Sequence, residues 1–277
     1  MMRVAVLGLG HWGRNWVRTL SQLPEVKSLV GVDISQDQRL LVQEEFPGVD
    51  CIEIGDDIRA VLQDPSVDAV IVATPASTHV GLAIACLQAK KHILVEKPTA
   101  MSTVEAARLW ELAKKQGVVL MAGHTALFTP EAECVRRLLE QGDLGEPIFF
   151  ESYHGNFGIV RRDASVLWDL GPHPVSLLVA LLDPKVNRVQ ASGLKQSWDG
   201  LDTCYMSLTT AQGATAQMTV TWRSPIKRRH WAVGGTRRTV LVDELAPANR
   251  VQIFDIGMDL PHVAPPPAQH RGYRNST

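Results

Sequence analysis

The chain has 277 residues, enough for two domains of ordinary size or one large one. Its composition, 45% hydrophobic and 21% charged, is that of a globular protein. The formal net charge of −1 offers no general attraction to nucleic acid or to an anionic membrane, so neither partner is expected. The four cysteines are scattered without CxxC spacing, which predicts no disulfide framework and no metal site and favours the reducing cytoplasm. No apolar run is long enough to span a bilayer.

The chain opens with a short apolar segment and a glycine-rich turn. Val4–Leu7 is expected to form a buried strand and residues 14–22 a helix, so the glycines lie between strand and helix. In that context the first glycine permits a tight turn, the second admits a pyrophosphate, and the third lets the helix approach the strand. Backbone N–H groups at the helix start then face the phosphates. We assign cofactor contacts to Gly8, Gly10, His11, Trp12 and Gly13.

An acidic residue follows the second predicted strand. This strand, Ser28–Val32, ends at Asp33, about 20 residues after the glycines. An acid at this place hydrogen-bonds the adenosine ribose hydroxyls and repels a 2′-phosphate, so NAD is expected and NADP is less favoured. A purely structural glycine turn is the alternative for the motif alone. The strand, the helix and Asp33 in register favour dinucleotide binding.

Strands and helices keep alternating up to about residue 122. Strands are expected at residues 51–54, 67–73, 93–95 and 118–122, and helices at residues 56–63, 78–89 and 102–116. Asp56 is a possible cap of the first of these helices, and Ser102 with Glu105 fits a capping box on the last. Repeated units of this length predict an α/β domain, residues 1–123, built on a Rossmann doubly wound parallel sheet.

The tripeptide Glu96-Lys97-Pro98 follows one of these strands. The carboxyl end of a parallel strand faces the crevice in which such sheets bind ligands. A lysine there can be tuned by desolvation toward acid–base work. Because Glu-Lys-Pro also occurs by chance in surface turns, its meaning depends on the motifs around it.

Three motifs of this half together resemble the Gfo/Idh/MocA family of nicotinamide-dependent oxidoreductases. They are the glycine motif, Thr74-Pro75 with His79, and the segment Lys91–Pro98. The resemblance implies that the Thr-Pro loop lies along the cofactor and that the lysine touches both the nicotinamide ribose and a substrate hydroxyl. These roles fall on Thr74, Pro75, Glu96 and Lys97. For His79, a cofactor contact and a local hydrogen bond at the helix start are both open.

After residue 123 the pattern changes to mostly strands. A helix is expected at residues 130–141 with Leu138 and Leu139 inward, and strands at residues 148–154, 186–195, 203–210, 214–222, 230–233 and 239–242. Alternating polar and apolar residues indicate an α+β domain, residues 124–277, with a mostly antiparallel sheet that has one open face. We expect this domain to bind substrate and to mediate a homo-oligomer, a dimer or a tetramer.

A second candidate chemical site precedes the apolar run at residues 175–182. Pro172 and Pro174 are compatible with the first turn of a helix there. Asp169 and His173 are four residues apart, and on a helical turn they share one face, where the carboxylate would fix the imidazole tautomer. The alternative is that Asp169 caps the helix and His173 is a buried polar residue. The family resemblance extends to this Asp-x-x-x-His pattern and implies that both residues flank the substrate carbon that loses hydride.

These motifs predict an NAD-dependent dehydrogenase or reductase that acts on CH–OH groups of a sugar-like substrate. His173 would take the hydroxyl proton, and Asp169 would orient the His173 ring or stabilise its charge. Lys97 would hydrogen-bond the reacting oxygen. Substrate contacts are assigned to Asn156, Arg161 and Arg162. Arginines suit a phosphate or a carboxylate, although a solvated loop is an equal alternative for this pair.

The substrate and even the class of function have alternatives. The region around residues 161–169 resembles the branch that acts on nucleotide-linked amino sugars, such as 3-dehydrogenases of UDP-N-acetylglucosaminuronate. Inositols and free sugars stay open. A non-catalytic dinucleotide-binding sensor or scaffold is the alternative from another class.

The end of the sequence departs from the family pattern. Residues 258–277 contain Pro265-Pro266-Pro267 and no apolar periodicity, so an irregular tail is expected. The resemblance implies a further strand and a long terminal helix that pack against the nucleotide-binding half, and we expect this piece to be missing.

Overall fold

The computed structural model describes residues 1–47, 52–157, 164–195 and 200–255. The chain forms two compact units, Met1–Gly123 and a second one from His124 onward. Each unit buries apolar clusters of its own.

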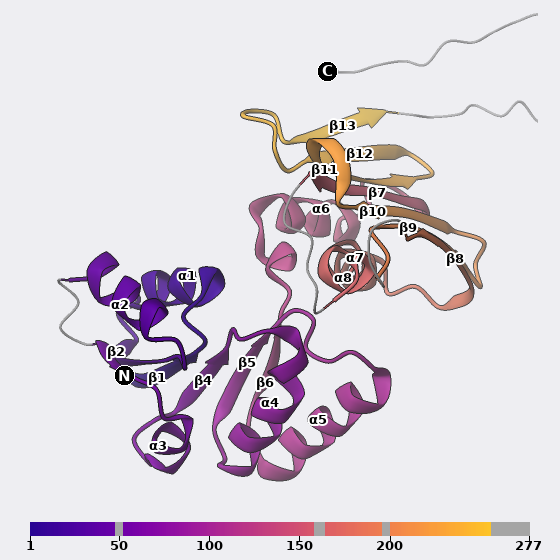
Figure 1. Cartoon of the computed structure of the whole chain (residues 1–277). Helices are drawn as coiled ribbons and strands as arrows, with labels where there is room; N and C mark the ends of the chain where they lie inside the picture. Colours follow the sequence, from indigo (N-terminus) through magenta and orange to yellow (C-terminus); the bar gives the residue numbers. More distant parts are fainter. Residues whose placement is uncertain (48–51, 158–163, 196–199, 256–277) are drawn as a thin grey trace, which may run out of the picture. The chain divides into compact units, whose positions relative to one another are not determined.

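The first unit is a six-stranded parallel sheet with helices on both faces (Figure 1). The strand order is β3-β2-β1-β4-β5-β6, and every neighbouring pair is parallel. The strands are β1 (Met2–Leu7), β2 (Val26–Val32), β3 (Ile52–Gly55), β4 (Ala69–Val72), β5 (His92–Glu96) and β6 (Leu120–Gly123). The helices are α1 (His11–Leu20), α2 (Gln36–Glu45), α3 (Ile58–Gln63), α4 (His79–Gln88) and α5 (Thr103–Gln116), with a 3-10 turn η1 (Ala76–Thr78). This confirms the predicted doubly wound sheet.

The two faces of this sheet bury different clusters. Val17 of α1 and Val42 of α2 are buried on one face. Val61 of α3, Leu87 of α4 and Leu109 of α5 are buried on the other. Because both faces are covered, the strands are nearly continuous apolar runs rather than alternating ones.

Side-chain caps decide where two of these helices begin. Ser102 Oγ accepts a hydrogen bond from the backbone N of Glu105 at 3.2 Å, as the capping pattern predicted. The cap of α3 is Asp57, whose Oδ1 accepts from Arg59 N at 2.8 Å. The prediction of Asp56 was therefore wrong by one residue, because Asp57 is the extended residue next to the helix start.

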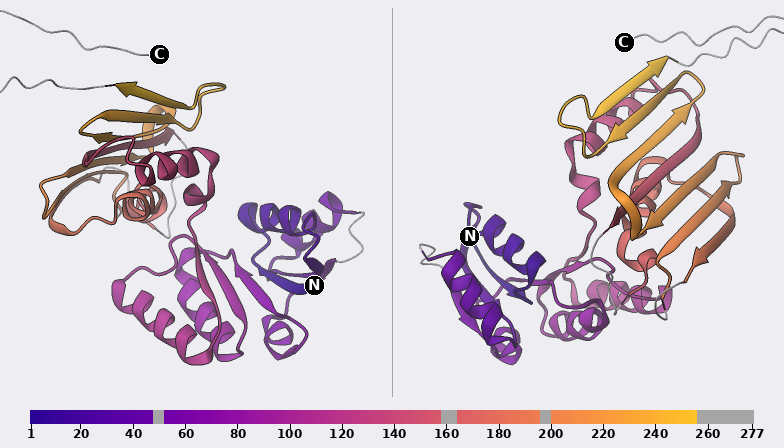
Figure 2. Two further views of the ribbon diagram at one scale, coloured as in Figure 1. Left: turned by 180° about the vertical axis from the view of Figure 1, so that it is seen from behind. Right: turned by 45° about the horizontal axis from the view of Figure 1, so that its top comes forward.

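The second unit is built on a seven-stranded sheet of order β13-β12-β11-β7-β10-β9-β8 (Figure 2). Every pair is antiparallel except the parallel pair β7 and β10. The strands are β7 (Pro147–Phe157), β8 (Val186–Leu194), β9 (Thr203–Thr210), β10 (Thr215–Thr221), β11 (Arg223–Gly235), β12 (Arg238–Asp243) and β13 (Val251–Asp255). The helices are α6 (Pro130–Glu140), α7 (Val166–Leu170) and α8 (Pro172–Leu182), with a 3-10 turn η2 (Thr125–Phe128). The mostly antiparallel sheet was predicted.

Two strands of this sheet differ from the prediction. β11 spans Arg223–Gly235 and pairs with β7 over most of its length, whereas only residues 230–233 were predicted. The first part of this strand was not predicted because the basic residues Lys227–Arg229 interrupt the alternation of polar and apolar residues. β13 was not predicted, and it pairs only with β12 at the edge of the sheet.

The three helices pack on one face of the sheet. Val135 of α6, Val166 of α7 and Leu177 of α8 join the core formed with the inner side chains of the strands. Pro172 and Pro174 occupy the first turn of α8, as predicted. On the opposite face the rings of Tyr153 and His230 stack with centroids 5.5 Å apart. In the described parts of both units, no helix has the length and apolarity needed to cross a bilayer.

Candidate functional site

The glycine loop has a shape that requires two of its glycines. Gly8 has φ +88°, and a Cβ there would lie 2.8 Å from the carbonyl O of Ala73. A Cβ on Gly13 would lie 1.8 Å from the carbonyl O of Gly8, so helix α1 could not approach the loop so closely. A Cβ on Gly10 would meet no protein atom within 4 Å. The loop therefore leaves room beside Gly10, where the motif predicts a pyrophosphate.

Helix α1 begins directly on this loop. Its N-cap is Gly10, which makes no side-chain capping bond, so no side chain occupies the N–H groups of the first turn. His11 and Trp12 start the helix with exposed side chains, and their rings are 5.7 Å apart in an edge-to-face arrangement. Uncapped N–H groups at a helix start suit a phosphate, so these residues fit the dinucleotide.

Asp33 lies beside the loop at the carboxyl end of β2. Its Oδ2 accepts a hydrogen bond from Leu9 N at 2.7 Å and its Oδ1 accepts from Ser35 N at 2.8 Å. Arg39 of α2 donates through Nη1 to the carbonyl O of Asp33 at 2.6 Å, and its Nη2 lies 3.7 Å from Asp56. The Arg39 guanidinium thus already contacts two oxygen atoms of the protein.

The Thr-Pro loop follows β4. Thr74 Oγ1 lies 2.7 Å from Thr78 Oγ1, which donates to the carbonyl O of Pro75 at 2.7 Å. His79 is 1% exposed, and its ring nitrogens lie 2.8 Å from the carbonyl oxygens of Pro98 and Thr74. Of the two alternatives for His79, this geometry favours a structural role, because both ring nitrogens face backbone carbonyls.

The Glu-Lys-Pro segment ends β5. Lys97 is half-buried, and its peptide bond to Pro98 is cis. Glu96 is 5% exposed, and its Oε1 accepts a hydrogen bond from Trp16 Nε1 at 2.8 Å. Nothing in the local sequence pattern indicated this partner, which is 80 residues away.

In the second unit, β7 and α8 bring two histidines together. Phe150, Ser152 and His154 of β7 are buried at alternate positions. They therefore share the helix-covered face. The ring of His154 stacks on that of His173 of α8, with centroids 5.2 Å apart and planes inclined by 23°. His154 was missed because a histidine within a strand has no motif of its own.

Asp169 lies in α7, just before α8. It is 9% exposed, and its Oδ2 accepts a hydrogen bond from Trp222 Nε1 at 3.1 Å. The N-cap of α8 is Gly171, so Asp169 is not its cap. Gly171 has helical torsion angles, φ −60° and ψ −32°, so α7 leads into α8 without a reversal of the chain.

Asn156 lies two residues after His154 on β7, so the two side chains point to the same face of the sheet. Its Oδ1 is buried, and no residue in the described ranges hydrogen-bonds it. Arg161 and Arg162 lie outside the described residues.

A third arginine, Arg223 at the start of β11, donates through Nε to the buried Asp202 Oδ2 at 2.7 Å. The sequence carried no signal for this arginine.

The predicted residues that the structure describes are divided between the two units. In the first, the glycine loop, Asp33, the Thr-Pro loop and Lys97 follow the carboxyl ends of β1, β2, β4 and β5, along one edge of the sheet. In the second, the predicted Asn156, Asp169 and His173 come from β7, α7 and α8, and His154, which was not predicted, lies on β7. Within the described ranges, no three His, Cys, Asp or Glu residues are placed to hold a metal ion.

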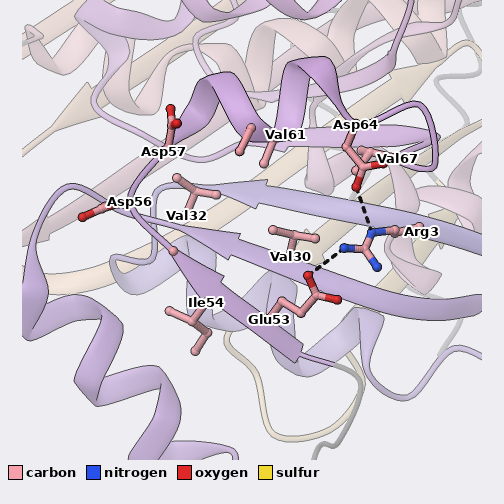
Figure 3. Close-up of a pocket in the computed structure, with 12 residues that line it drawn as sticks. Arg3, Val30, Val32, Glu53, Ile54, Asp56, Asp57, Val61, Asp64 and Val67 are labelled. Carbon is pink, nitrogen blue, oxygen red and sulfur yellow. Dashed lines mark hydrogen bonds and ion pairs between the residues drawn. The ribbon is translucent and has the colours of Figure 1, made fainter.

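A hollow of about 230 Å³ lies elsewhere in the first unit, between α3 and strands β2 and β3 (Figure 3). Val30, Val32 and Val61 line its apolar part. At one end the Arg3 guanidinium lies 2.7 Å from Glu53 and 3.5 Å from Asp64. None of the predicted cofactor residues is among its described lining residues.

The fold and the glycine loop define the first unit as an NAD-binding Rossmann domain. Residues 2–124 match the model of an oxidoreductase family with an NAD-binding Rossmann fold. Residues 133–241 match the GFO/IDH/MocA C-terminal domain. The chain therefore belongs to the Gfo/Idh/MocA family of oxidoreductases.

Several members of the family are similar to this chain. The scyllo-inositol 2-dehydrogenase (NAD(+)) of Bacillus subtilis (strain 168) is 29% identical over 69% of this chain and 57% of its own length. A structure of UDP-N-acetylglucosamine 3-dehydrogenase from Acidithiobacillus ferrooxidans is 26% identical with a TM-score of 0.78, covering 92% of this chain and 80% of that one.

A third relative was solved with cofactor. The structure of GenD2 from gentamicin A biosynthesis, in complex with NAD, is 28% identical with a TM-score of 0.81. The match covers 87% of this chain and 72% of GenD2. The chain spans less than two thirds of the length of several curated relatives that it matches, for example 58% of the myo-inositol 2-dehydrogenase of Thermotoga maritima.

Proposed function

We propose that this protein transfers hydride between a secondary alcohol of a sugar-like substrate and C4 of NAD. The observation that carries the proposal is the pair His173 and Asp169, in which the imidazole is stacked on His154 and the carboxylate is held by Trp222. A base and an acid that are each held in position suit proton removal from a hydroxyl. The family membership supports the same class of reaction.

Each residue has a separate role in this proposal. His173 accepts the hydroxyl proton, and Asp169 stabilises the imidazolium that forms. Lys97 donates a hydrogen bond to the reacting oxygen and lowers the cost of its negative charge. The bound nicotinamide supplies the hydride acceptor.

The proposed cofactor is NAD rather than NADP. Asp33 is fixed beside the glycine loop, where its carboxylate can accept from the adenosine ribose hydroxyls. A 2′-phosphate would need a cation there, and Arg39 is engaged with Asp33 O and Asp56. Thr74 and Pro75 of the neighbouring loop are proposed to contact the cofactor, as the family resemblance implies.

The proposed substrate is a nucleotide-linked amino sugar. Arginines suit its phosphate groups, and Arg161 and Arg162 are the residues proposed for this contact. Asn156 Oδ1, which is buried and has no hydrogen-bond partner in the described part of the chain, suits a sugar hydroxyl. An inositol is the second candidate, supported by the similarity to the Bacillus subtilis scyllo-inositol dehydrogenase.

Two further functions are proposed for the second unit. It carries the substrate contacts, and the face of its sheet opposite the helices pairs copies of the chain into a homo-oligomer.

A dinucleotide-binding sensor or scaffold without catalysis is the competing proposal for the whole protein. The presence of both Lys97 and His173 argues against it, because a protein that only binds the dinucleotide needs neither.

The experiment follows absorbance of the reduced nicotinamide with NAD and a panel of UDP-sugars, inositols and free sugars. Lys97→Ala and His173→Ala should each lower kcat by about a hundredfold or more, while the exposed control Lys115→Ala on α5 should not. Unchanged turnover in both site variants would refute the catalytic assignment. Binding of NADH without turnover of any panel member would favour the sensor.

A further inference from the structure

A long-range hydrogen bond holds the segment that carries Lys97. Trp16 lies on α1, and Glu96 is the last residue of β5. The indole Nε1 donates to Glu96 Oε1 at 2.8 Å, and Glu96 Oε2 accepts from the backbone N of Lys97 at 3.3 Å. Each oxygen of this carboxylate therefore already accepts a hydrogen bond from within the protein.

The side chain of Glu96 is buried and packs beside Gly123 of the neighbouring strand. A buried carboxylate that loses a donor is costly, which ties Glu96 to the indole. On the other side, Gly123 of β6 is its partner in the sheet. A Cβ on Gly123 would lie 3.2 Å from Glu96 Oε2, so the carboxylate fills the space that a side chain on β6 would need.

Helix α1 connects this bond to the cofactor loop. The helix begins at His11 on the glycine loop, and Trp16 follows about one and a half turns later. A helix of this length moves as one body, so the position of its start determines the position of the Trp16 indole. The bond to Glu96 then links the phosphate-binding end of α1 to the residue before Lys97.

A second contact restrains the same segment from the opposite side. The buried ring of His79 lies between the carbonyl O of Pro98, just after Lys97, and the carbonyl O of Thr74. Lys97 is thus flanked by Glu96, held from α1, and by Pro98, held from the Thr-Pro loop. Both restraints come from helices, α1 and α4, that follow loops assigned to the cofactor.

We propose that Glu96 is a positioning residue, through which α1 sets the place of the Lys97 amine, rather than a residue that contacts the cofactor. This inference rests on the proposed function, in which Lys97 acts on the reacting oxygen. A displacement of about 1 Å in such a group can cost a hundredfold in rate. The Trp16–Glu96 bond therefore affects turnover without touching either ligand.

The test compares Glu96→Ala, Glu96→Gln, Trp16→Phe and the double variant Glu96→Ala/Trp16→Phe. Glutamine keeps an oxygen that can accept from the indole. Glu96→Ala and Trp16→Phe should each lower kcat by about tenfold or more and leave the NADH dissociation constant within about twofold. The double variant should be no slower than the worse single variant, because both changes break one bond. Glu96→Gln should recover most of the loss.

A second readout does not need turnover. The reactivity of the Lys97 amine toward an acylating reagent, measured by peptide mass spectrometry, should change in Glu96→Ala and Trp16→Phe. It should stay at the wild-type level in Trp110→Phe, which alters an exposed tryptophan on α5. Melting temperatures of all variants ensure that every assay is made on folded protein.

The outcomes separate the inference from the proposed function. If Glu96→Ala and Glu96→Gln weaken NADH binding while Trp16→Phe does not, Glu96 contacts the cofactor and the inference fails. If Glu96→Ala and Trp16→Phe lower the melting temperature but leave kcat and Lys97 labelling unchanged, the bond has only a structural role. That result also overturns the inference. If the wild-type protein turns over no substrate, the proposed function fails, and the labelling result alone decides the role of Glu96.

Discussion

The ring of His154 lies against the ring of His173, with centroids 5.2 Å apart and planes inclined by 23°. One imidazole comes from β7 and the other from α8, so the stack also ties the helix to the sheet. His154 is 6% exposed, which means that its own ring is fixed by packing. A neighbour held in this way limits the orientations open to His173, and a pre-oriented base is a more effective one.

Replacing His154 should therefore separate the stacking from the chemistry. His154→Ala removes the ring beside His173 and should lower kcat by about tenfold, whereas His154→Phe keeps a flat ring and should retain more activity. The measurement is kcat and KM for both variants on the same substrate, with melting temperatures as a check. Equal losses in the two variants would show that ring stacking is not what His154 contributes.

The hydrogen bond from Trp222 to Asp169 makes a second prediction. Trp222→Phe removes the indole donor of a buried carboxylate and should lower the free energy of unfolding by about 1–3 kcal/mol. It should also slow turnover, since the carboxylate that is proposed to stabilise the His173 imidazolium loses a restraint. Chemical denaturation of Trp222→Phe, Asp169→Leu and the double variant measures the coupling. Purely additive losses would mean that the two side chains do not depend on each other.

Cofactor preference gives a third prediction. Asp33→Ser removes the carboxylate proposed to accept from the ribose hydroxyls and to repel a 2′-phosphate. The ratio of kcat/KM for NAD to that for NADP should fall by roughly tenfold or more, the worth of a hydrogen bond to a charged group. The ratio is the right quantity because loss of the bonds to Leu9 and Ser35 would impair both cofactors alike. Asp37→Ser, an exposed acid on α2, serves as the control.

The parts of the site that could be predicted are those encoded by neighbouring residues. The glycine spacing, the strand before it and Asp33 lie within one βαβ unit, and Pro172 with Pro174 marks a helix start by local sterics alone. The capping residue of α3 was missed by one position because Asp56 and Asp57 are chemically equivalent. Only the backbone torsion angles decide which of the two precedes the helix.

The partners of the candidate residues could not be predicted. Trp16 and Glu96 are separated by 80 residues, and Asp169 and Trp222 by 53. Such contacts depend on how strands are ordered in a sheet, which periodicity does not encode. The parallel pairing of β7 with β10 is of the same kind, because the two strands alternate like any antiparallel pair. The sequence therefore predicted most of the helices and strands, and the structure supplied the long-range contacts between them.

A half-buried glutamate on the second unit, Glu244, gives a prediction about pH. Burial raises the pKa of Glu244, and the nearby carboxylates of Glu131 and Asp243 raise it further, against the opposing effects of Arg229 and a hydrogen bond from Trp231. The folded protein then holds the Glu244 proton at pH values where the unfolded chain, near its ordinary 4.5, has released it. Stability from this group is therefore present below pH 4.5 and is lost as the pH rises through the folded-state pKa.

Glu244→Gln should remove this loss, because glutamine is never charged and can still accept from the Trp231 indole. The variant should melt at a higher temperature than the wild-type protein at pH 8, and the difference should shrink toward zero as the pH falls to 4. Thermal denaturation at a series of pH values, with the exposed Glu140→Gln as the control, measures the difference curve. A gain that is equal at all pH values would indicate better packing rather than the removal of a half-buried charge. A lower melting temperature at pH 8 would mean that the attraction of Arg229 outweighs the cost of burial.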